Sequence, residues 1–317
     1  MTDVLVLRAL GLGDLLASVA ALRGLRRAWP GSRLVLGAPA ALGGWLTTLG
    51  VVDDVVAVRG LHDGAVLASR AGTPEVAVNL HGRGPESHRL LAGLAPGRVV
   101  GFACPEGGFE DGPQWRDDEH EVDRWVRLAV WAGGAAGADD LRLPSQGDRA
   151  GHVVLHPGAA SGSRRWPAER WAAVAAVLGA DGTHVVVTGT SAEAELCARV
   201  AAAAPGVEDA CGQHDLPGLG RLVGTAGLVL SGDTGVAHVA TAFGTPSVTL
   251  FGPVAPALWG ARIDPHLHVA LWPGSHDGLR PGDPHGAYPD ERLLATGVPE
   301  VVDAARALLE AARGSAA

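Results

Sequence analysis

The chain has 317 residues, a length that is long for one domain and suits two domains of about 150 residues each. Its formal net charge of -9 argues against a nucleic-acid partner, because nucleic-acid-binding surfaces are normally basic. No apolar stretch approaches the ~18 residues that a membrane helix needs, and the sequence does not open on a basic leader with a long apolar segment. With no basic amphipathic helix either, we expect at most peripheral contact with a membrane.

The basic residues and the cysteines narrow the chemistry further. Cys104, Cys197 and Cys211 are too widely spaced for a metal-binding knuckle and are odd in number, so we expect no metal site and no dependence on disulfides. This usage is typical of a reducing cytoplasm. The sequence contains no lysine, so any anion-binding site must use arginine, histidine or backbone N–H groups.

The first half of the chain alternates short apolar strands with helices. Strands are expected at 3–8, 33–37, 54–58, 75–80 and 97–102. A helix is expected over 14–28, because apolar side chains recur there at helical spacing from Leu15 to Leu25. A second helix is expected over 119–132, and the small residues of 133–140 are interpreted as a linker.

The second half repeats this alternation. Strands are expected at 152–156, 184–188, 227–231, 246–251 and 267–271. Helices are expected at 167–179, 191–204, 235–243 and 298–313, with a surface loop at 273–297. The pattern predicts an α/β protein with two Rossmann-like, doubly wound parallel sheets, in residues 1–148 and 149–317, and a ligand cleft between them. The last helix could pack back on the first domain.

The most informative segment is 231–238, of sequence SGDTGVAH. It follows an apolar run and leads into a glycine-terminated helix, which predicts a strand, a tight turn carrying Asp233, and a helix start. Such a turn lies at the carboxyl edge of a parallel sheet, where ligands bind, and N–H groups at a helix start favour phosphate. Thr234 and His238 share one helix face, with Gly235 between them. A lone histidine such as His238 also fits a hydrogen-bonded core residue.

A glycine-rich turn with one acid, LGLGD at 10–14, follows the first strand. Leu16 stands in place of the third glycine of a dinucleotide-binding fingerprint, and no acid closes the second strand, so nicotinamide binding is disfavoured. The glycines let a substrate approach the backbone closely. Asp14 has two interpretations: the N-cap of the following helix, or a general base that faces the interdomain cleft.

The segment 156–167 joins a strand to a helix and begins with small residues. Gly158 and Ala159 permit close backbone approach, while Arg164 and Arg165 can donate paired hydrogen bonds to phosphate oxygens. The alternative interpretation is a flexible loop with two solvated arginines.

A further turn, TGTSAEAE at 188–195, also follows a strand. Thr188 and Gly189 begin it, and Glu193 near the helix start could accept hydrogen bonds from ribose hydroxyls. Glu193 could equally complement the dipole of the helix.

Taken together, these motifs resemble glycosyltransferase family 9, the heptosyltransferase-like enzymes, over nearly the whole chain. Three ordered motifs carry the resemblance: VLVLRALGLGD at 4–14 with AALR at 20–23, HPGA at 156–159 with RRWP at 164–167, and GDTG at 232–235 with His238 and FGP at 251–253. Each motif alone would be weak, but their order and compatible spacing make the combination specific.

The resemblance implies a GT-B architecture and inverting, metal-independent sugar transfer, with no cofactor beyond the nucleotide diphosphate-sugar itself. It implies that Asp14 is the base toward the acceptor hydroxyl, and that Arg164 stands where the family usually has a lysine on the donor phosphates. The residues implied at the donor are Gly158, Ala159, Arg164, Thr188, Gly189, Glu193, Asp233, Thr234, Gly235 and His238. Gly13, His81 and Arg83 are expected on the acceptor side, where 79–83 departs from the pattern of the lipopolysaccharide enzymes.

The sequence therefore predicts a cytoplasmic glycosyltransferase that uses a nucleotide-sugar, with ADP-heptose as the leading candidate donor. The acceptor could be a cell-envelope glycan, a lipid-linked sugar or a small molecule. Two alternatives use the same donor site: a GT-B-fold sugar-nucleotide epimerase or hydrolase, and a non-catalytic nucleotide-sugar-binding protein.

Overall fold

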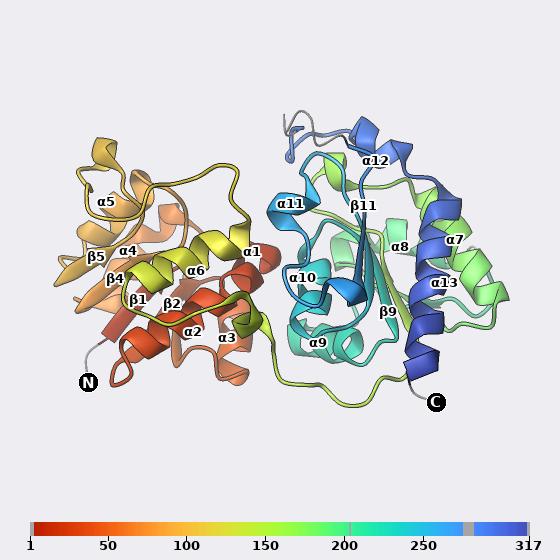
Figure 1. The fold of residues 1–317 in the computed structure, drawn as a ribbon, viewed down its shortest axis with the longest axis horizontal. Helices are drawn as coiled ribbons and strands as arrows, with labels where there is room; N and C mark the ends of the chain where they lie inside the picture. The colour runs from red at the N-terminus through yellow and green to blue at the C-terminus, as the bar shows by residue number, and fades with distance from the viewer. Residues whose placement is uncertain (1–2, 203, 275–281, 316–317) are drawn as a thin grey trace. The chain divides into compact units, whose positions relative to one another are not determined.

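The chain forms two compact α/β units. The structure is a computed structural model that describes residues 3–202, 204–274 and 282–315. The units divide between Leu141 and Arg142 (Figure 1), whereas the sequence placed the boundary between 148 and 149. We describe each unit by itself, as the N-terminal unit and the C-terminal unit.

The N-terminal unit is built on a five-stranded parallel sheet with the order β3-β2-β1-β4-β5. Its strands are β1 Asp3–Leu7, β2 Arg33–Ala38, β3 Asp54–Ala57, β4 Val76–Asn79 and β5 Arg98–Val100. Val4 of the central strand β1 pairs with Leu34 on one side and with Val76 on the other. The order of the strands therefore reverses between β1 and β4, which makes the ends of these two strands the switch point of the sheet.

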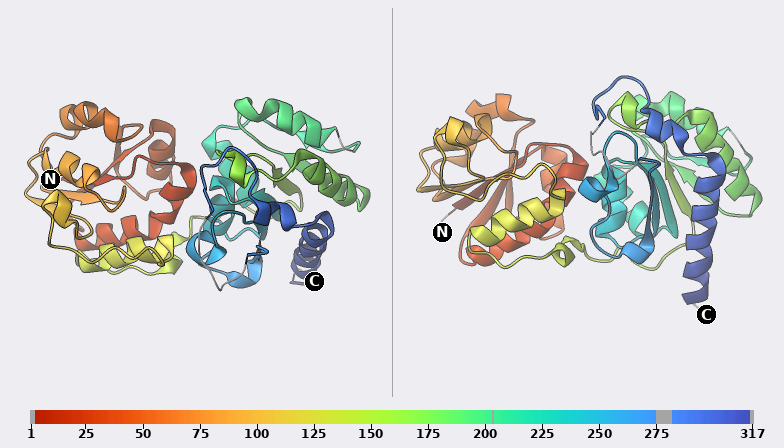
Figure 2. Two further views of the ribbon diagram at one scale, coloured as in Figure 1. Left: turned by 90° about the horizontal axis from the view of Figure 1, so that it is seen from above. Right: turned by 45° about the horizontal axis from the view of Figure 1, so that its top comes forward.

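Helices cover both faces of this sheet (Figure 2). They are α1 Leu12–Ala17, α2 Val19–Ala28, α3 Ala40–Thr48, α4 Gly64–Ala71, α5 Glu86–Ala92 and α6 Glu121–Trp131. Leu67 of α4 and Leu91 of α5 join one apolar cluster with Leu5 and Leu7 of β1. Helices α2 and α6 pack together closely because α2 carries Gly24, where an added Cβ would lie 3.1 Å from the Cβ of Ala129 on α6.

The C-terminal unit contains a six-stranded parallel sheet with the order β11-β10-β9-β6-β7-β8. Its strands are β6 Val153–His156, β7 Val185–Val187, β8 Glu208–Asp209, β9 Leu228–Gly232, β10 Ser247–Leu250 and β11 His268–Leu271. Here the order reverses between β6 and β9, where Val154 pairs with Val229. This pair of strands marks the switch point of the second sheet.

The helices of this unit are α7 Ala168–Ala180, α8 Ala194–Ala201, α9 Leu216–Gly224, α10 Gly235–Ala242, α11 Pro256–Trp259, α12 Glu291–Ala295 and α13 Val298–Ser315. A large apolar cluster joins α7, α8 and α13 to one face of the sheet. Trp166 and Trp171 lie in it edge to face, with 4.9 Å between their ring centroids. Val301 and Ala305 place α13 in the same cluster, so this helix packs within the C-terminal unit.

Several elements differ from the expectation. The helix expected over 14–28 is divided into α1 and α2 at Ser18, whose hydroxyl donates to the carbonyl of Leu15. Six helices were not predicted: α3, α4, α5, α9, α11 and α12. The loop expected at 273–297 contains α12, which begins after its N-cap, Asp290. The Asp290 side chain accepts a hydrogen bond from the Arg292 N–H. Residues 275–281 of the expected loop lie outside the described residues.

Short 3-10 turns complete the described structure, at Leu61–Asp63, Pro105–Gly107, Ala138–Leu141, Gly162–Arg164, Ser191–Glu193 and Pro265–Leu267. The linker expected at 133–140 therefore ends in the third of these turns. Across the described residues, no helix has the length and apolar character required to cross a membrane.

Candidate functional site

The two switch points gather most of the candidate residues. In the N-terminal unit, the segments after β1 and β4 bring residues 8–14 and 80–83 to one place, which we call the Asp14 edge. In the C-terminal unit, the segments after β6, β7 and β9 bring residues 157–167, 188–193 and 233–235 together, which we call the Asp233 edge. Switch points of parallel sheets are the usual ligand sites of such folds.

Asp14 lies in the first turn of α1, directly before the buried residues Leu15, Leu16 and Ala17. The N-cap of α1 is Gly11, so the interpretation of Asp14 as the N-cap is wrong. Instead its carboxylate reaches back and accepts the Gly11 N–H, as an acid at the third helical position commonly does. The side chain of Asp14 is one-third exposed, at 33%, so solvent and ligands can reach it.

Arg8 fixes the main chain around Asp14. This arginine is 1% exposed and donates from Nε and Nη2 to the carbonyl of Asp14, at 3.0 and 2.9 Å. Its Nη1 donates to the carbonyl of Leu80 at the end of β4, so one guanidinium ties the two segments of the switch point together. The guanidinium also lies over the ring of Trp125, 4.6 Å from its centroid.

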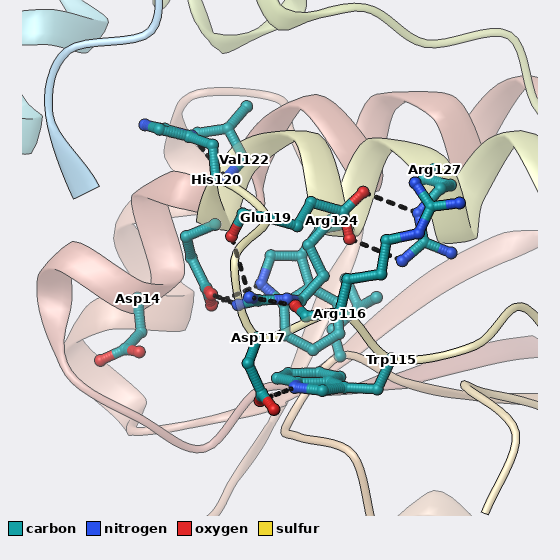
Figure 3. Close-up of polar contacts among 12 residues, drawn as sticks. Asp14, Trp115, Arg116, Asp117, Glu119, His120, Val122, Arg124 and Arg127 are labelled. Atoms are coloured by element: carbon teal, nitrogen blue, oxygen red, sulfur yellow. Dashed lines mark hydrogen bonds and ion pairs between the residues drawn. The ribbon is translucent and has the colours of Figure 1, made fainter. Parts of the chain in front are cut away.

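Glu121, the first residue of α6, pairs with Arg8. Its Oε1 accepts from Arg8 Nη2 at 2.9 Å and from Trp125 Nε1 at 2.6 Å, and its Oε2 accepts from Arg124. Figure 3 shows Asp14 on α1 beside the start of α6, where Glu119, His120 and Arg124 lie. Burial alone would raise the pKa of Glu121, but Arg8, Trp125 and Arg124 together hold it below its usual range. Glu121 is therefore a buried carboxylate that stays ionised.

The pKa of Asp14 shifts in the opposite direction. Burial raises the pKa of Asp14, the charge of Arg8 offsets part of that increase, and the like charge of Glu121 adds to it. The result is a carboxylate whose pKa lies above its ordinary value and which therefore binds a proton more readily. Such a group is suited to act as a general base.

The acceptor-side candidates have different surroundings. His81 accepts the Ala9 N–H at its Nδ1, 3.2 Å away, so this imidazole carries its proton on Nε2. Burial, with a smaller contribution from Arg8, lowers the pKa of His81 to about 4. The half-buried Gly13 lies in the first turn of α1, whereas Arg83 is exposed and forms no ion pair with any residue that the structure describes. The fold thus brings His81, but not the Arg83 side chain, onto Arg8 and Ala9.

At the Asp233 edge, the turn between β9 and α10 is held by its main chain. The N–H of the buried Asp233 donates to the carbonyl of Leu250, and its carbonyl accepts from Arg164 Nη1 at 3.2 Å. Thr234 is the N-cap of α10 but makes no side-chain cap. The buried oxygens Thr234 Oγ1 and Ser231 Oγ have no hydrogen-bond partner among the described residues, which is unusual unless a ligand or water supplies one.

Arg164 ends the 3-10 turn Gly162–Arg164 and bridges to the Asp233 turn from the segment after β6. Its Nε donates to the hydroxyl of Ser161, which itself donates to the carbonyl of Pro284. The Ser163 N–H donates to the carbonyl of Gly286, and the main-chain carbonyl of Ser163 accepts a hydrogen bond from the N–H of Asp290. Residues 284–290 therefore support the segment that carries Arg164.

Glu193 closes the 188–193 turn by a capping box. Its Oε2 accepts from both the N–H and the hydroxyl of Thr190, at 2.8 and 2.9 Å. The other oxygen, Oε1, lies over Gly158, where an added Cβ would be only 2.0 Å away. Helix-start stabilisation is thus one role of Glu193, and contact with the segment after β6 is a second.

The remaining donor candidates line the same edge or help to shape it. The hydroxyl of the buried Thr188 lies 3.0 Å from His156 Nδ1. Gly189 leaves room for Cys197, since an added Cβ there would lie 2.5 Å from its sulfur. His238 packs edge to face on Trp259, with 5.8 Å between the ring centroids, and Ala159 accepts a hydrogen bond from Arg165 at its carbonyl.

Sequence reasoning overlooked two features of these edges. It placed Arg8 in the strand expected at 3–8 and Glu121 in the helix expected over 119–132, but it gave neither side chain a role, so the pair Arg8 and Glu121 was missed. A charged residue directly after an apolar strand was the available signal. The support of Arg164 by 284–290 gave no signal in the sequence. Within the described parts of the chain, no cluster of three or more His, Cys, Asp or Glu side chains could hold a metal ion.

The fold has counterparts among solved structures. Two doubly wound parallel units are typical of GT-B glycosyltransferases, and solved structures of that class match this chain almost end to end. The glycosyl transferase family 9 structure from Veillonella parvula matches with a TM-score of 0.81 at 21% identity, covering 97% of each chain. The Escherichia coli ADP-heptose lps heptosyltransferase II matches with a TM-score of 0.77 at 20% identity, covering 97% of this chain and 98% of the other. The predicted fold class is confirmed.

Sequence comparisons match a narrower part of the chain, most of which lies in the C-terminal unit. A family model described as glycosyltransferase family 9 (heptosyltransferase) matches residues 133–272. Lipopolysaccharide heptosyltransferase 1 of Pseudomonas aeruginosa is 30% identical over 139 residues, which cover 43% of this chain and 38% of that protein. The match thus spans well under half the length of this curated relative. The predicted resemblance to glycosyltransferase family 9 is confirmed over this part of the chain.

Proposed function

We propose that the protein is an inverting, metal-independent glycosyltransferase, which moves a sugar from a nucleotide diphosphate donor to an acceptor hydroxyl. The observation that carries this proposal is the Asp233 edge, where Arg164 and the start of α10 converge on one turn with two buried hydroxyls that lack partners. The C-terminal unit would hold the donor, and the N-terminal unit would act on the acceptor.

A diphosphate suits the chemistry of the Asp233 edge. The first N–H groups of a helix have no intrahelical acceptor and favour anions, and α10 begins at Gly235 directly after the turn. Arg164 adds a cation with several N–H donors, and the hydroxyl of Thr234 adds one more hydrogen-bond donor. Thr188, Gly189 and Glu193 would meet the ribose. A related structure is that of an ADP-heptose heptosyltransferase, so ADP-heptose is our first candidate donor.

The reaction uses the two edges in complementary ways. The Asp14 carboxylate takes the proton of the acceptor hydroxyl while that oxygen bonds to the anomeric carbon. The bond from this carbon to the diphosphate breaks, and attack from the opposite face inverts the centre. Negative charge builds on the leaving diphosphate, so Arg164 and the α10 N–H groups bind the transition state more tightly than the ground state. No cofactor beyond the donor is required by this scheme.

The acceptor would approach the Asp14 edge past Gly13, His81 and Arg83. Because His81 is neutral, it can donate a hydrogen bond from Nε2 to a sugar hydroxyl without adding charge. We propose a glycan, a lipid-linked sugar or a small molecule as the acceptor, with at most peripheral membrane contact and no nucleic-acid partner. The cytoplasmic location inferred from the cysteines stays a prediction.

The test is a thermal-shift panel of nucleoside diphosphates and their sugars, followed by transfer assays with the donors that bind. A donor at 100 times its Kd should add about 2.7 kcal/mol of stability. Sugar should pass to an acceptor with inversion, and the rate should survive a metal chelator. Rapid turnover of the donor without any acceptor would instead identify an epimerase or hydrolase. Binding without turnover under any condition would identify a non-catalytic protein.

A further inference from the structure

Arg8 lies between two carboxylates, and it treats them differently. Its Nη2 donates to Glu121 Oε1 at 2.9 Å, a normal hydrogen bond for a charged pair. The same nitrogen lies 3.5 Å from Asp14 Oδ1, beyond the usual range for an N–H···O hydrogen bond. Both guanidinium bonds from Arg8 to Asp14 go to its main-chain carbonyl instead. Arg8 thus holds the backbone of Asp14 and leaves its carboxylate only a loose ion pair.

Glu121 is locked in the position that produces this arrangement. It is 5% exposed, and the indole of Trp125 and the guanidinium of Arg124 bind its two oxygens from the same helix, α6. Arg124 is fixed in turn by the carbonyls of Arg116 and Glu119, each at 2.9 Å. The carboxylate of Glu121 therefore cannot move away from Arg8 without leaving buried donors unsatisfied.

We propose that Glu121 is a positioning residue: by occupying Arg8, it stops Arg8 from forming a close pair with the Asp14 carboxylate and so leaves that carboxylate able to accept a proton. This inference rests on the proposed function, in which Asp14 is the base. A bidentate arginine pair on Asp14 would stabilise the ionised form and weaken it as a base.

Among the charged groups around Asp14, Arg8 and Glu121 are the two that shift its pKa. From α6, Glu121 faces Arg8 and is itself paired with Arg124. From the segment after β4, His81 is neutral because burial and Arg8 lower its pKa to about 4. Helix α2 also packs on α1, and it directs Arg23 to the carbonyl of Asp140 rather than to Asp14. The like charge of Glu121 raises the pKa of Asp14, and Arg8 lowers it.

The experiment compares Glu121→Gln with the matched control Glu119→Gln, in the full chain. Glu119 pairs with Arg127 and makes no side-chain contact with Arg8, so its loss removes a nearby charge without touching the pair. The carboxyl titration of Asp14 is followed by carbon-13 NMR of labelled aspartate, and its signal is assigned as the one that is missing in Asp14→Asn. The pH profile of kcat is measured on the same proteins.

With Glu121→Gln we expect the Asp14 titration and the acid limb of kcat to move to lower pH together, with kcat at neutral pH falling severalfold and donor affinity unchanged. Glu119→Gln should move neither. A titration of Asp14 that stays in place, or that moves to higher pH, would overturn the proposal. If the titration moves and the kcat limb does not, the coupling of Glu121 to Asp14 is supported and the role of Asp14 as base in the proposed function fails instead.

A second variant keeps the test decisive if Glu121→Gln does not fold. Glu121→Asp retains the charge and draws the carboxylate back from Arg8 by one methylene. It should shift the Asp14 titration in the same direction by a smaller amount, and an unshifted titration would again overturn the proposal.

Discussion

The Asp14 edge and the Asp233 edge occupy equivalent switch points in two similar sheets, but different kinds of chemical groups form them. Side chains with full charges form the first, where Arg8 and Glu121 are both nearly inaccessible to solvent. Main-chain groups and small residues form most of the second, with Arg164 as its main charged donor. The first edge should therefore be sensitive to changes of charge at constant shape, and the second to changes of volume.

The largest effect should come from Asp14→Asn, which preserves shape and removes the proposed base. We expect kcat to fall by about 10²–10⁴-fold, the usual contribution of a general base, with donor affinity unchanged. Stability at neutral pH should not decrease. Because the pKa of Asp14 is raised in the folded state, its ionised form costs stability as pH rises through that pKa, and asparagine removes this cost. Steady-state kinetics, calorimetry and thermal unfolding measure the three quantities, and full activity in the variant would contradict the assignment.

Arg164→Ala should have the next largest effect, on donor binding. The loss of a charge-assisted hydrogen bond costs about 1.5–3 kcal/mol, which corresponds to roughly tenfold to hundredfold weaker binding of a nucleoside diphosphate. Arg306→Ala is the control, because Arg306 forms an exposed pair with Asp181 on the same unit. Calorimetry should show no change for Arg306→Ala. Equal affinities for Arg164→Ala and the wild type would remove Arg164 from the donor site.

Gly158→Ala tests the sensitivity of the Asp233 edge to volume. The new Cβ would lie 2.0 Å from Glu193 Oε1, so Glu193 must move and its capping box with Thr190 must open. We expect a loss of about 1 kcal/mol in the free energy of unfolding, the usual value of a helix cap, and severalfold weaker donor binding. Gly31→Ala has open space around its new Cβ and serves as the control. Denaturant unfolding of both variants decides, and equal losses would show that the crowding at Gly158 has no special cost.

The smallest effect concerns His81 and the pH range of the Asp14 edge. Since the pKa of His81 is lowered to about 4, its imidazole should stay neutral from pH 8 down to about 5. Protons then bind the unfolded chain first, so His81 lowers the stability of the folded protein as pH falls from its ordinary pKa toward about 4. NMR of the imidazole, assigned with His81→Gln, measures this directly. A midpoint near 6.5 would show that Arg8 and burial do not control this histidine.

Sequence patterns revealed the two edges but not what holds them. Apolar runs followed by glycine-rich turns identified the strands that end at each switch point, since a buried parallel strand needs continuous apolar residues. The link between Arg8 and Glu121 spans 113 positions, and no local pattern encodes a contact of that separation. The helix break at Ser18 was also missed, because the apolar spacing continues across it. The position of Asp14 within α1 depends on that short first helix.

The support of the Arg164 segment by residues 284–290 has a consequence for biosynthesis. Ser161 and Ser163 find hydrogen-bond partners more than 120 positions further along the chain, at Pro284 and Gly286. During translation, which delivers the N-terminal residues first, the Asp14 edge has all of its partners once α6 has emerged from the ribosome. The Arg164 segment has to wait for the residues up to Asp290, so a nascent chain can complete one edge well before the other.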